Sequence, residues 1–415
     1  MPSPASPYRA SYRKTTLLAC LAGAAAALAA LAGWHWLPRA AAGAAAPLAG
    51  LVAFAALVLA AAGALVLARD RRMTEGRGDL FLALNRTREP QAVAEAAPAQ
   101  VPAWRRRLAR RVLGHELIVG DLVEVRPWEE IRATLDGQGC LDGLPFMPEM
   151  LALCGRRMRV FKSMHRLFDY RKSRQMRHMD GAVLLVGAVC DGSRHGGCEA
   201  ACHSIWKAAW LRRVSASDAA LAAAAPAASP AHAWPGTEGP HYRCQLTELQ
   251  AASRPVGAWS PVNFVRPLVS GNVAPAAFAV GWLTHLFNLV QRWRGGVGFP
   301  TLEPPAPGFA PQDDLRLQPG DAVRVRPSAE LRAAMNEQLA HRGLYFEEDM
   351  LKHCGQRQVV QAEVRRLIDI VTGEMRTMKT PAYLLRGVHF SGERQMFNAQ
   401  YEPLFWRAAW LQVDG

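Results

Sequence analysis

The chain repeats itself at a constant distance. The phrase GDLVEVRP, which begins at Gly120, returns as GDAVRVRP at Gly320, and GLPFMPEMLALCG at Gly143 returns as GLYFEEDMLKHCG at Gly343. The words WKAAWL and WRAAWL close the two copies. A constant offset over most of a hundred residues is typical of two copies of one module, so the fold must be a small unit that is built twice.

The pattern within each copy predicts a small β-barrel. DLVEVRP alternates apolar and polar residues and ends at proline, which indicates a half-buried strand, whereas AVLLVGAVC is a continuous apolar run that indicates a buried one. Several short strands in fewer than a hundred residues are typical of a small barrel. The opening GDxVxVR resembles the first strand of SH3-like barrels. We therefore expect a mainly β fold with helical segments, in which Trp206, Trp210, Trp406 and Trp410 pack in the cores.

The N-terminal part carries two long runs without a charged side chain, residues 15–37 and 40–68. Each is long enough to cross a hydrocarbon core of about 30 Å as a helix, which predicts a transmembrane hairpin. A cleavable signal peptide and an alanine-rich soluble helix pair are the alternatives. Basic residues precede the first run and follow the second, so both termini are expected in the cytoplasm of a bacterium, at its inner membrane.

The remaining boundaries follow from composition. An apolar stretch at 272–294 is expected to be a buried or surface-lying helix, with a third membrane segment as the alternative. The expected parts are a cytoplasmic tail (1–14), the hairpin (15–68), a basic juxtamembrane segment (69–115), a first module (116–214), an Ala/Pro linker (215–240), a helical connecting region (241–318) and a second module (319–415).

The copies differ most in one loop. The first has CDGSRHGGCEAACH, from Cys190 to His203, where the second has FSGERQMFNAQYEP. Thiols and imidazoles grouped in this way suit a structural zinc ion, with an iron–sulfur cluster or an unliganded loop as alternatives. The candidate ligands are Cys190, Cys198, Cys202, His195, His203 and Cys154.

The formal net charge of +14 favours anionic partners such as membrane lipid. WRRRLARR lies in the basic segment after the second apolar run, and a second basic stretch with aromatic residues begins at Phe161. Nucleic acid is a less favoured partner, and the protein partners stay unidentified. The candidate contacts are Arg105, Arg106, Arg107, Arg110, Arg111, Lys162, Arg166, Arg171, Lys172 and Arg174.

The words GLPFMPEMLALCG, HGGCEAAC and WKAAWL, with the second copy, resemble a bacterial membrane-anchored family that has a duplicated module of this kind. The resemblance implies the architecture and no activity. Neither a Walker loop nor a GxSxG elbow occurs, which argues against common classes of enzyme. We expect a membrane-anchored cytoplasmic scaffold or binding protein. The alternatives are a metal-dependent redox or sensor protein and a nucleic-acid-binding protein.

Overall fold

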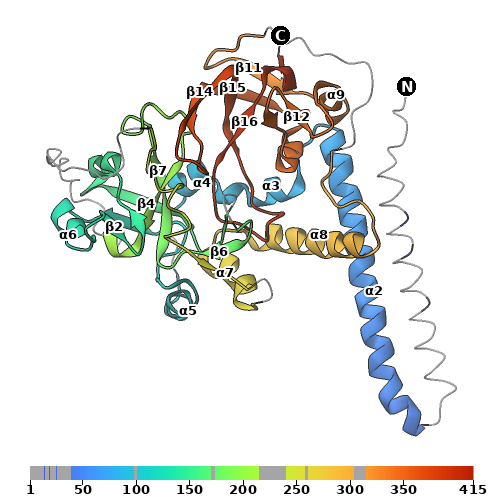
Figure 1. The fold of residues 1–415 in the computed structure, drawn as a ribbon. Coiled ribbons are helices and arrows are strands. Elements are labelled where there is room, and N and C mark those ends of the chain that lie inside the picture. Colours follow the sequence, from blue (N-terminus) through green and yellow to red (C-terminus); the bar gives the residue numbers. More distant parts are fainter. Residues whose placement is uncertain are drawn as a thin grey trace. The chain divides into compact units, whose positions relative to one another are not determined.

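The computed structural model describes residues 39–97, 101–169, 173–214, 240–257, 260–302 and 315–414, together with Lys14, Leu18 and Ala25. Helices and antiparallel sheets are mixed in it (Figure 1). Helices account for 34% and strands for 25%, so the expectation of a mainly β chain is corrected to a mixed fold. Helices outside the repeated modules contribute much of the difference.

The first copy forms a five-stranded sheet from β1 (Leu122–Val125), β4 (Arg157–Ser163), β7 (Ala182–Val189), β8 (His203–Lys207) and β9 (Leu211–Arg213). The strand order is β8-β7-β4-β1-β9, and neighbouring strands pair in the antiparallel direction. The alternation predicted for β1 is confirmed, because Val123 and Val125 are buried between partly exposed neighbours.

The second copy forms a sheet from β11 (Ala322–Val325), β14 (Arg357–Ile368), β15 (Met375–His389), β16 (Pro403–Trp406) and β17 (Leu411–Val413). Its order, β16-β15-β14-β11-β17, repeats that of the first sheet strand by strand. β14 and β15 stay paired as far as Ile368 and Met375. In the first copy this hairpin is interrupted, and β5 (Leu167–Phe168) and β6 (Met176–His178) instead join β10 (Arg254–Pro255).

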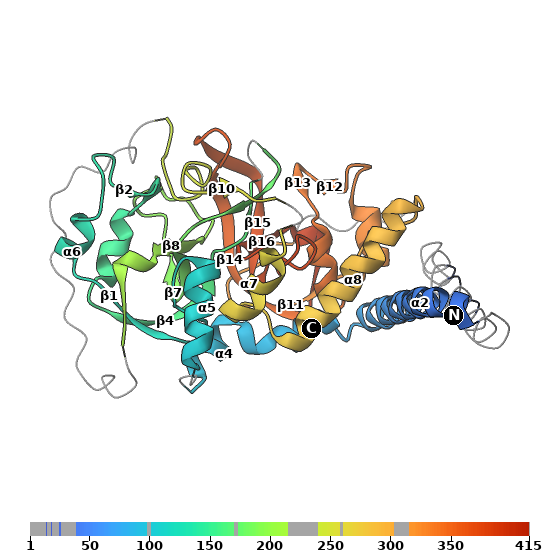
Figure 2. The same ribbon diagram turned by 90° about the horizontal axis from the view of Figure 1, so that it is seen from below.

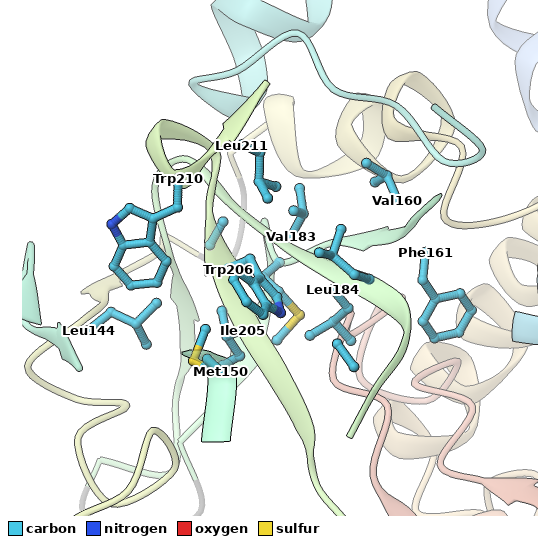
Figure 3. Close-up of a cluster of buried hydrophobic side chains, with 14 of the residues drawn as sticks. Leu144, Met150, Val160, Phe161, Val183, Leu184, Ile205, Trp206, Trp210 and Leu211 are labelled. Atoms are coloured by element: carbon cyan, nitrogen blue, oxygen red, sulfur yellow. The ribbon is translucent and has the colours of Figure 1, made fainter. Parts of the chain in front are cut away.

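The repeated tryptophans lie in the core, as predicted. Trp206 and Trp210 are fully buried, and both contact the ring of Phe146 edge-on at centroid distances of 6.0 and 5.3 Å. Figure 3 shows them among aliphatic side chains of the first sheet. Trp406 and Trp410 are buried to the same degree in the second copy.

Short elements complete the copies at matching places. Each copy has a short helix after its first strand, then a hairpin of two two-residue strands followed by a 3-10 helix. A 3-10 turn precedes the last strand of each copy. These elements are β2 (Cys140–Leu141), β3 (Leu144–Pro145), η2 (Pro148–Leu153), α6 (Trp128–Arg132), η3 (Ala208–Trp210), β12 (Ala340–His341), β13 (Leu344–Tyr345), η6 (Glu348–His353), α9 (Ser328–Leu331), η5 (Arg332–Ala334) and η7 (Ala408–Trp410).

Helices dominate the rest of the described chain: α2 (Arg39–Thr74), α3 (Leu80–Asn85), η1 (Arg86–Arg88), α4 (Pro90–Glu95), α5 (Ala103–Leu113), α7 (Val262–Ser270) and α8 (Pro275–Trp293). α5 and α7 lie side by side (Figure 2) and share a core that includes Leu113 and Val269. Asn272, just before α8, hydrogen bonds both backbone groups of Ser163 at 2.8 Å, so it anchors the connecting region to β4.

The chain divides into two compact units, one formed by residues 1–83, 279–312 and 324–357 and the other by 84–278, 313–323 and 358–415. In the first, Ala62 and Val66 of α2 pack with Phe287 and Phe299. In the second, the core surrounds the tryptophans of the first sheet.

α2 contains a segment, Ala53–Thr74, whose length and composition suit a membrane span; among the described residues no other helix meets this criterion. Phe54 and Leu57 are exposed, whereas Arg69 near the C-terminal end is fully buried and bonded to Asp79 and Thr284. The predicted first span, 15–37, lies outside the described residues.

Candidate metal centre

The loop after β7 folds back on itself around a glycine. Gly192 has a φ of +68°, and a Cβ there would lie 1.8 Å from the carbonyl oxygen of Cys198. The Gly192 carbonyl accepts hydrogen bonds from His195 N and Gly197 N, at 2.9 and 3.0 Å. Cys190 N donates to Cys202 O at 2.8 Å and closes the base of the loop. Only glycine fits such a turn, which brings the first thiol and the imidazole together.

Three ligand atoms from two elements meet beside this turn. Cys190 Sγ lies 3.6 Å from His195 Nδ1, which lies 3.8 Å from Glu149 Oε1 on η2. All three ligand atoms lie within 4.8 Å of one another. Tetrahedral zinc, with bonds of about 2.0–2.3 Å to such atoms, separates its ligands by roughly 3.4–3.7 Å. The spacing of the triad is therefore close to that of a zinc site.

Two side chains of the triad each have a buried polar atom without a hydrogen-bond partner. His195 is 2% exposed, and its Nε2 has no hydrogen-bond partner. Glu149 Oε2 is also buried without a partner, and the Glu149 side chain is 9% exposed. Glu149 Oε1 lies near His195 Nδ1, so the carboxylate is only partly compensated, and a cation held by the triad would compensate it further. The donor set of carboxylate, thiolate and imidazole suits zinc.

The triad opens into a cavity of about 360 Å³ in the second unit. Its lining includes the cysteines Cys190, Cys198, Cys202 and Cys244 and the aliphatic residues Leu367 and Ile368 of β14. Cys244 reaches this place because its neighbour Gln245 hydrogen bonds both backbone groups of Ile205 on β8, at 2.7 and 2.8 Å. The cavity therefore has four cysteines in its lining, three from the loop and one, Cys244, from the connecting region.

Burial keeps three of these thiols protonated when no cation is present. It is the main cause that raises the pKa of Cys190, Cys202 and Cys244 above the ordinary value, and nearby acidic or thiol groups raise those of Cys190 and Cys202 further. A metal ion reverses this preference, because its charge stabilises the thiolate and releases the proton.

The remaining predicted ligands lie in different surroundings. Cys198, Cys202 and His203 all line the cavity, but the ring of His203 also packs against Phe161 and Tyr401. Burial lowers the pKa of His203 to about 4. Cys154 lies in the hydrophobic core of the first copy, where burial raises its pKa to about 11. The structure thus places Cys154 in the core, like a structural cysteine.

Two site residues were missed by sequence reasoning. Glu149 precedes the loop by about forty positions, and its only signal is that an acid, Asp349, recurs at the matching position. Cys244 follows the predicted linker, in a segment without a second copy. No periodicity or spacing connects either residue to the loop.

The arginines of α5 divide into half-buried and exposed groups. Arg105 donates to the backbone carbonyls of Leu268 and Val269, at 3.0 and 3.2 Å. Arg106 pairs with Asp121 at 2.7 Å. These two stabilise the contact of α5 with its surroundings. The exposed arginines are Arg107, Arg110 and Arg111, and of these Arg110 pairs with Glu116 at 2.8 Å.

The second basic stretch is largely inside. Lys162 and Arg166 are 6% and 5% exposed, and Lys162 Nζ lies 4.6 Å from the centroid of the Tyr401 ring. Burial lowers the pKa of Arg166 to about 10. Arg174 is exposed, while Arg171 and Lys172 lie outside the described residues. Lys162 and Arg166 are thus not placed to bind nucleic acid or lipid.

Comparison with known protein families, curated proteins and solved structures finds no match to this chain.

Proposed function

We propose that this chain is a membrane-anchored protein whose first module binds one zinc ion through Glu149, Cys190 and His195. The observation that carries the proposal is the meeting of these three ligand atoms within 4.8 Å, beside a buried oxygen of Glu149 that has no hydrogen-bond partner. The metal braces the loop against η2 and completes a binding site. The activity is binding rather than a known class of catalysis.

The anchor in this proposal is a hairpin of residues 15–37 and 40–68, with both termini on the cytoplasmic side of a bacterial inner membrane. The apolar, exposed surface of α2 around Phe54 and Leu57 supports a lipid environment there. Arg107, Arg110 and Arg111 would contact anionic lipid, each with roughly 1 kcal/mol.

The two modules are proposed to be SH3-like barrels. Their common order, in which the first strand lies between the second and the last, supports this interpretation. Tandem barrels held at a membrane suit a scaffold or binding protein that recruits other molecules.

A second candidate is a redox or sensor protein with an iron–sulfur cluster. Four cysteines, the usual ligand number of such clusters, line one cavity: Cys190, Cys198, Cys202 and Cys244. Zinc remains the first proposal, because the described residues bring together only one of these thiols with a histidine and a carboxylate at mononuclear spacing.

Elemental analysis of the full chain, purified in detergent without chelator and without oxygen, tests both candidates. Zinc binding predicts ~1 zinc per chain and a featureless visible spectrum. A cluster predicts iron with visible absorption that bleaches on reduction. Absence of both metals from the folded protein would contradict the metal-binding function.

Matched variants assign the site. Cys190→Ser and His195→Ala should each lower the zinc content to a small fraction of that of the parent protein. Asn398→Ser, at the position in the second copy that matches Cys198, should leave the zinc content unchanged. Loss of zinc in the Asn398→Ser variant would indicate a site elsewhere.

A further inference from the structure

We infer that the cavity beside the triad binds a small molecule with an apolar body and one neutral nitrogen or oxygen donor, which completes the coordination of the metal. This inference rests on the proposed zinc site. Three protein ligands are the number found in zinc sites that keep one position for an exchangeable ligand. The cavity lies against that position, since all three ligand residues line it.

Part of the cavity wall is apolar. This apolar wall is formed by Leu246 of the connecting region, by Leu367 and Ile368 at the end of β14, by Ile370 just beyond it, and by Phe405 of β16. Leu246, Leu367 and Phe405 are only half-buried, so they have surface left to cover. A cavity of about 360 Å³ falls in the range of small-molecule sites, which are mostly apolar with a few polar groups.

Charge selects the donor. Zinc with one carboxylate, one thiolate and one neutral imidazole has no net charge, so the metal offers little attraction for an additional anion. Glu402 and Asp369 also line the cavity, and the one arginine there, Arg376, already pairs with Asp369 and Glu374 at 3.4 and 3.2 Å. A neutral azole, amine or alcohol therefore fits, whereas a carboxylate meets like charge.

The test uses the full chain in detergent with cobalt in place of zinc, because the visible spectrum of cobalt reports on its ligands. The probes are imidazole, 1-hexylimidazole and hexanoate. Each buried methylene strengthens binding about fourfold. We expect 1-hexylimidazole to bind at least 50-fold more tightly than imidazole with only part of its chain buried, and hexanoate to change the cobalt spectrum little.

A blocking variant separates the cavity from the metal. Leu367→Trp adds bulk to the apolar wall and changes no ligand residue, so it should weaken 1-hexylimidazole at least tenfold and leave imidazole binding unchanged. Val371→Trp, at an exposed position beyond β14, is the matched control and should bind both probes as the parent does. Should Leu367→Trp fail to fold, Phe405→Ala removes a ring from the same wall and should weaken 1-hexylimidazole selectively.

The outcomes distinguish the two proposals. If no cobalt binds, the zinc site is wrong and the inference falls with it. If cobalt binds but 1-hexylimidazole and imidazole have equal affinity, the zinc site stands and the cavity inference is overturned. If hexanoate binds more tightly than 1-hexylimidazole, the neutral-donor class is overturned.

Discussion

The loops at Cys190–His203 and Phe390–Pro403 have the same backbone turn and different interiors. Gly392 has a φ of +72°, with a built Cβ 2.0 Å from the Asn398 carbonyl oxygen, which closely matches Gly192 and Cys198. Phe390 N donates to Glu402 O at 2.9 Å, as Cys190 N does to Cys202 O. The turn is thus a property of the module and does not depend on cysteine.

The polar side chains inside the second loop hydrogen bond one another. Asn398 Nδ2 donates to Gln395 Oε1 at 2.9 Å and to Gln400 Oε1 at 2.8 Å, and Asn398 Oδ1 accepts from Gln400 N. Gln395 stands where the first copy has His195, whose Nε2 lacks a partner. Side-chain amides thus close the second loop, whereas in our proposal a metal ion closes the first.

The loops also contact the opposite copies in an equivalent way. Glu199 N donates to Arg366 O, and Ala399 N donates to Arg166 O, each at 2.8 Å. Reciprocal contacts between matching positions are the signature of an isologous interface, here within one chain. A ligand in the first loop is therefore positioned to affect β14 of the second copy directly.

The largest effect should come from the shared turn. Gly192→Ala and Gly392→Ala each force a Cβ into a backbone carbonyl at a positive φ, so both should destabilise the protein by about 3–5 kcal/mol. Thermal unfolding of the two variants, with and without chelator, checks this. A small cost at Gly392 alone would mean that the loops do not share their fold.

The next largest effect is expected at His195, where a variant distinguishes metal binding from hydrogen bonding by side-chain amides. His195→Gln copies the residue of the second loop and should cost about 4 kcal/mol when free zinc is about a thousand times the dissociation constant. This cost should vanish in chelator, where the parent has lost the same stabilisation.

Asn398→Ala is the counterpart in the second loop. Asn398 is 2% exposed and bonded three times, so its loss should cost about 2 kcal/mol with or without chelator. Equal chelator dependence of His195→Gln and Asn398→Ala in denaturant unfolding would remove the distinction between the loops.

The copies are also expected to differ in how low pH affects their stability. His115 bonds Ser163 Oγ at 3.0 Å, and burial lowers the pKa of His115 to about 4; the matching residue is Leu315. Between pH 6.5 and 4 the unfolded chain binds a proton that the folded chain does not, so stability falls as pH falls. The loss amounts to about 3 kcal/mol over that range.

His115→Leu should remove this contribution and flatten the pH dependence of unfolding by one proton. An unchanged pH dependence in the variant would show that His115 is not the group that titrates.

Local pattern predicted much of the fold. The alternation around Val123, the apolar run of β7 and the constant spacing of the tryptophans each depend on neighbours in sequence, and each is confirmed. Burial of Lys162 was not predictable, because the ring beside it, Tyr401, lies about 240 positions away. Lysine is expected to be exposed unless such a partner is known.

The site was half predictable for the same reason. Cys190 and His195 lie on one short loop, so the sequence places them together. Glu149 and Cys244 reach the cavity through η2 and through the Gln245 contact with β8, which only the packed structure defines. The hydrogen bonds of Asn398 were not predictable either, because amide side chains that bond one another show no characteristic spacing in the sequence.

The central claim is that Glu149, Cys190 and His195 hold the metal, and X-ray absorption at the zinc edge of the full chain tests it most directly. The account predicts one sulfur neighbour at about 2.3 Å and light nitrogen or oxygen neighbours at about 2.0–2.1 Å. His195→Ala should abolish the signal of the bound metal. Four sulfur neighbours, or a metal that survives loss of His195, would contradict the account.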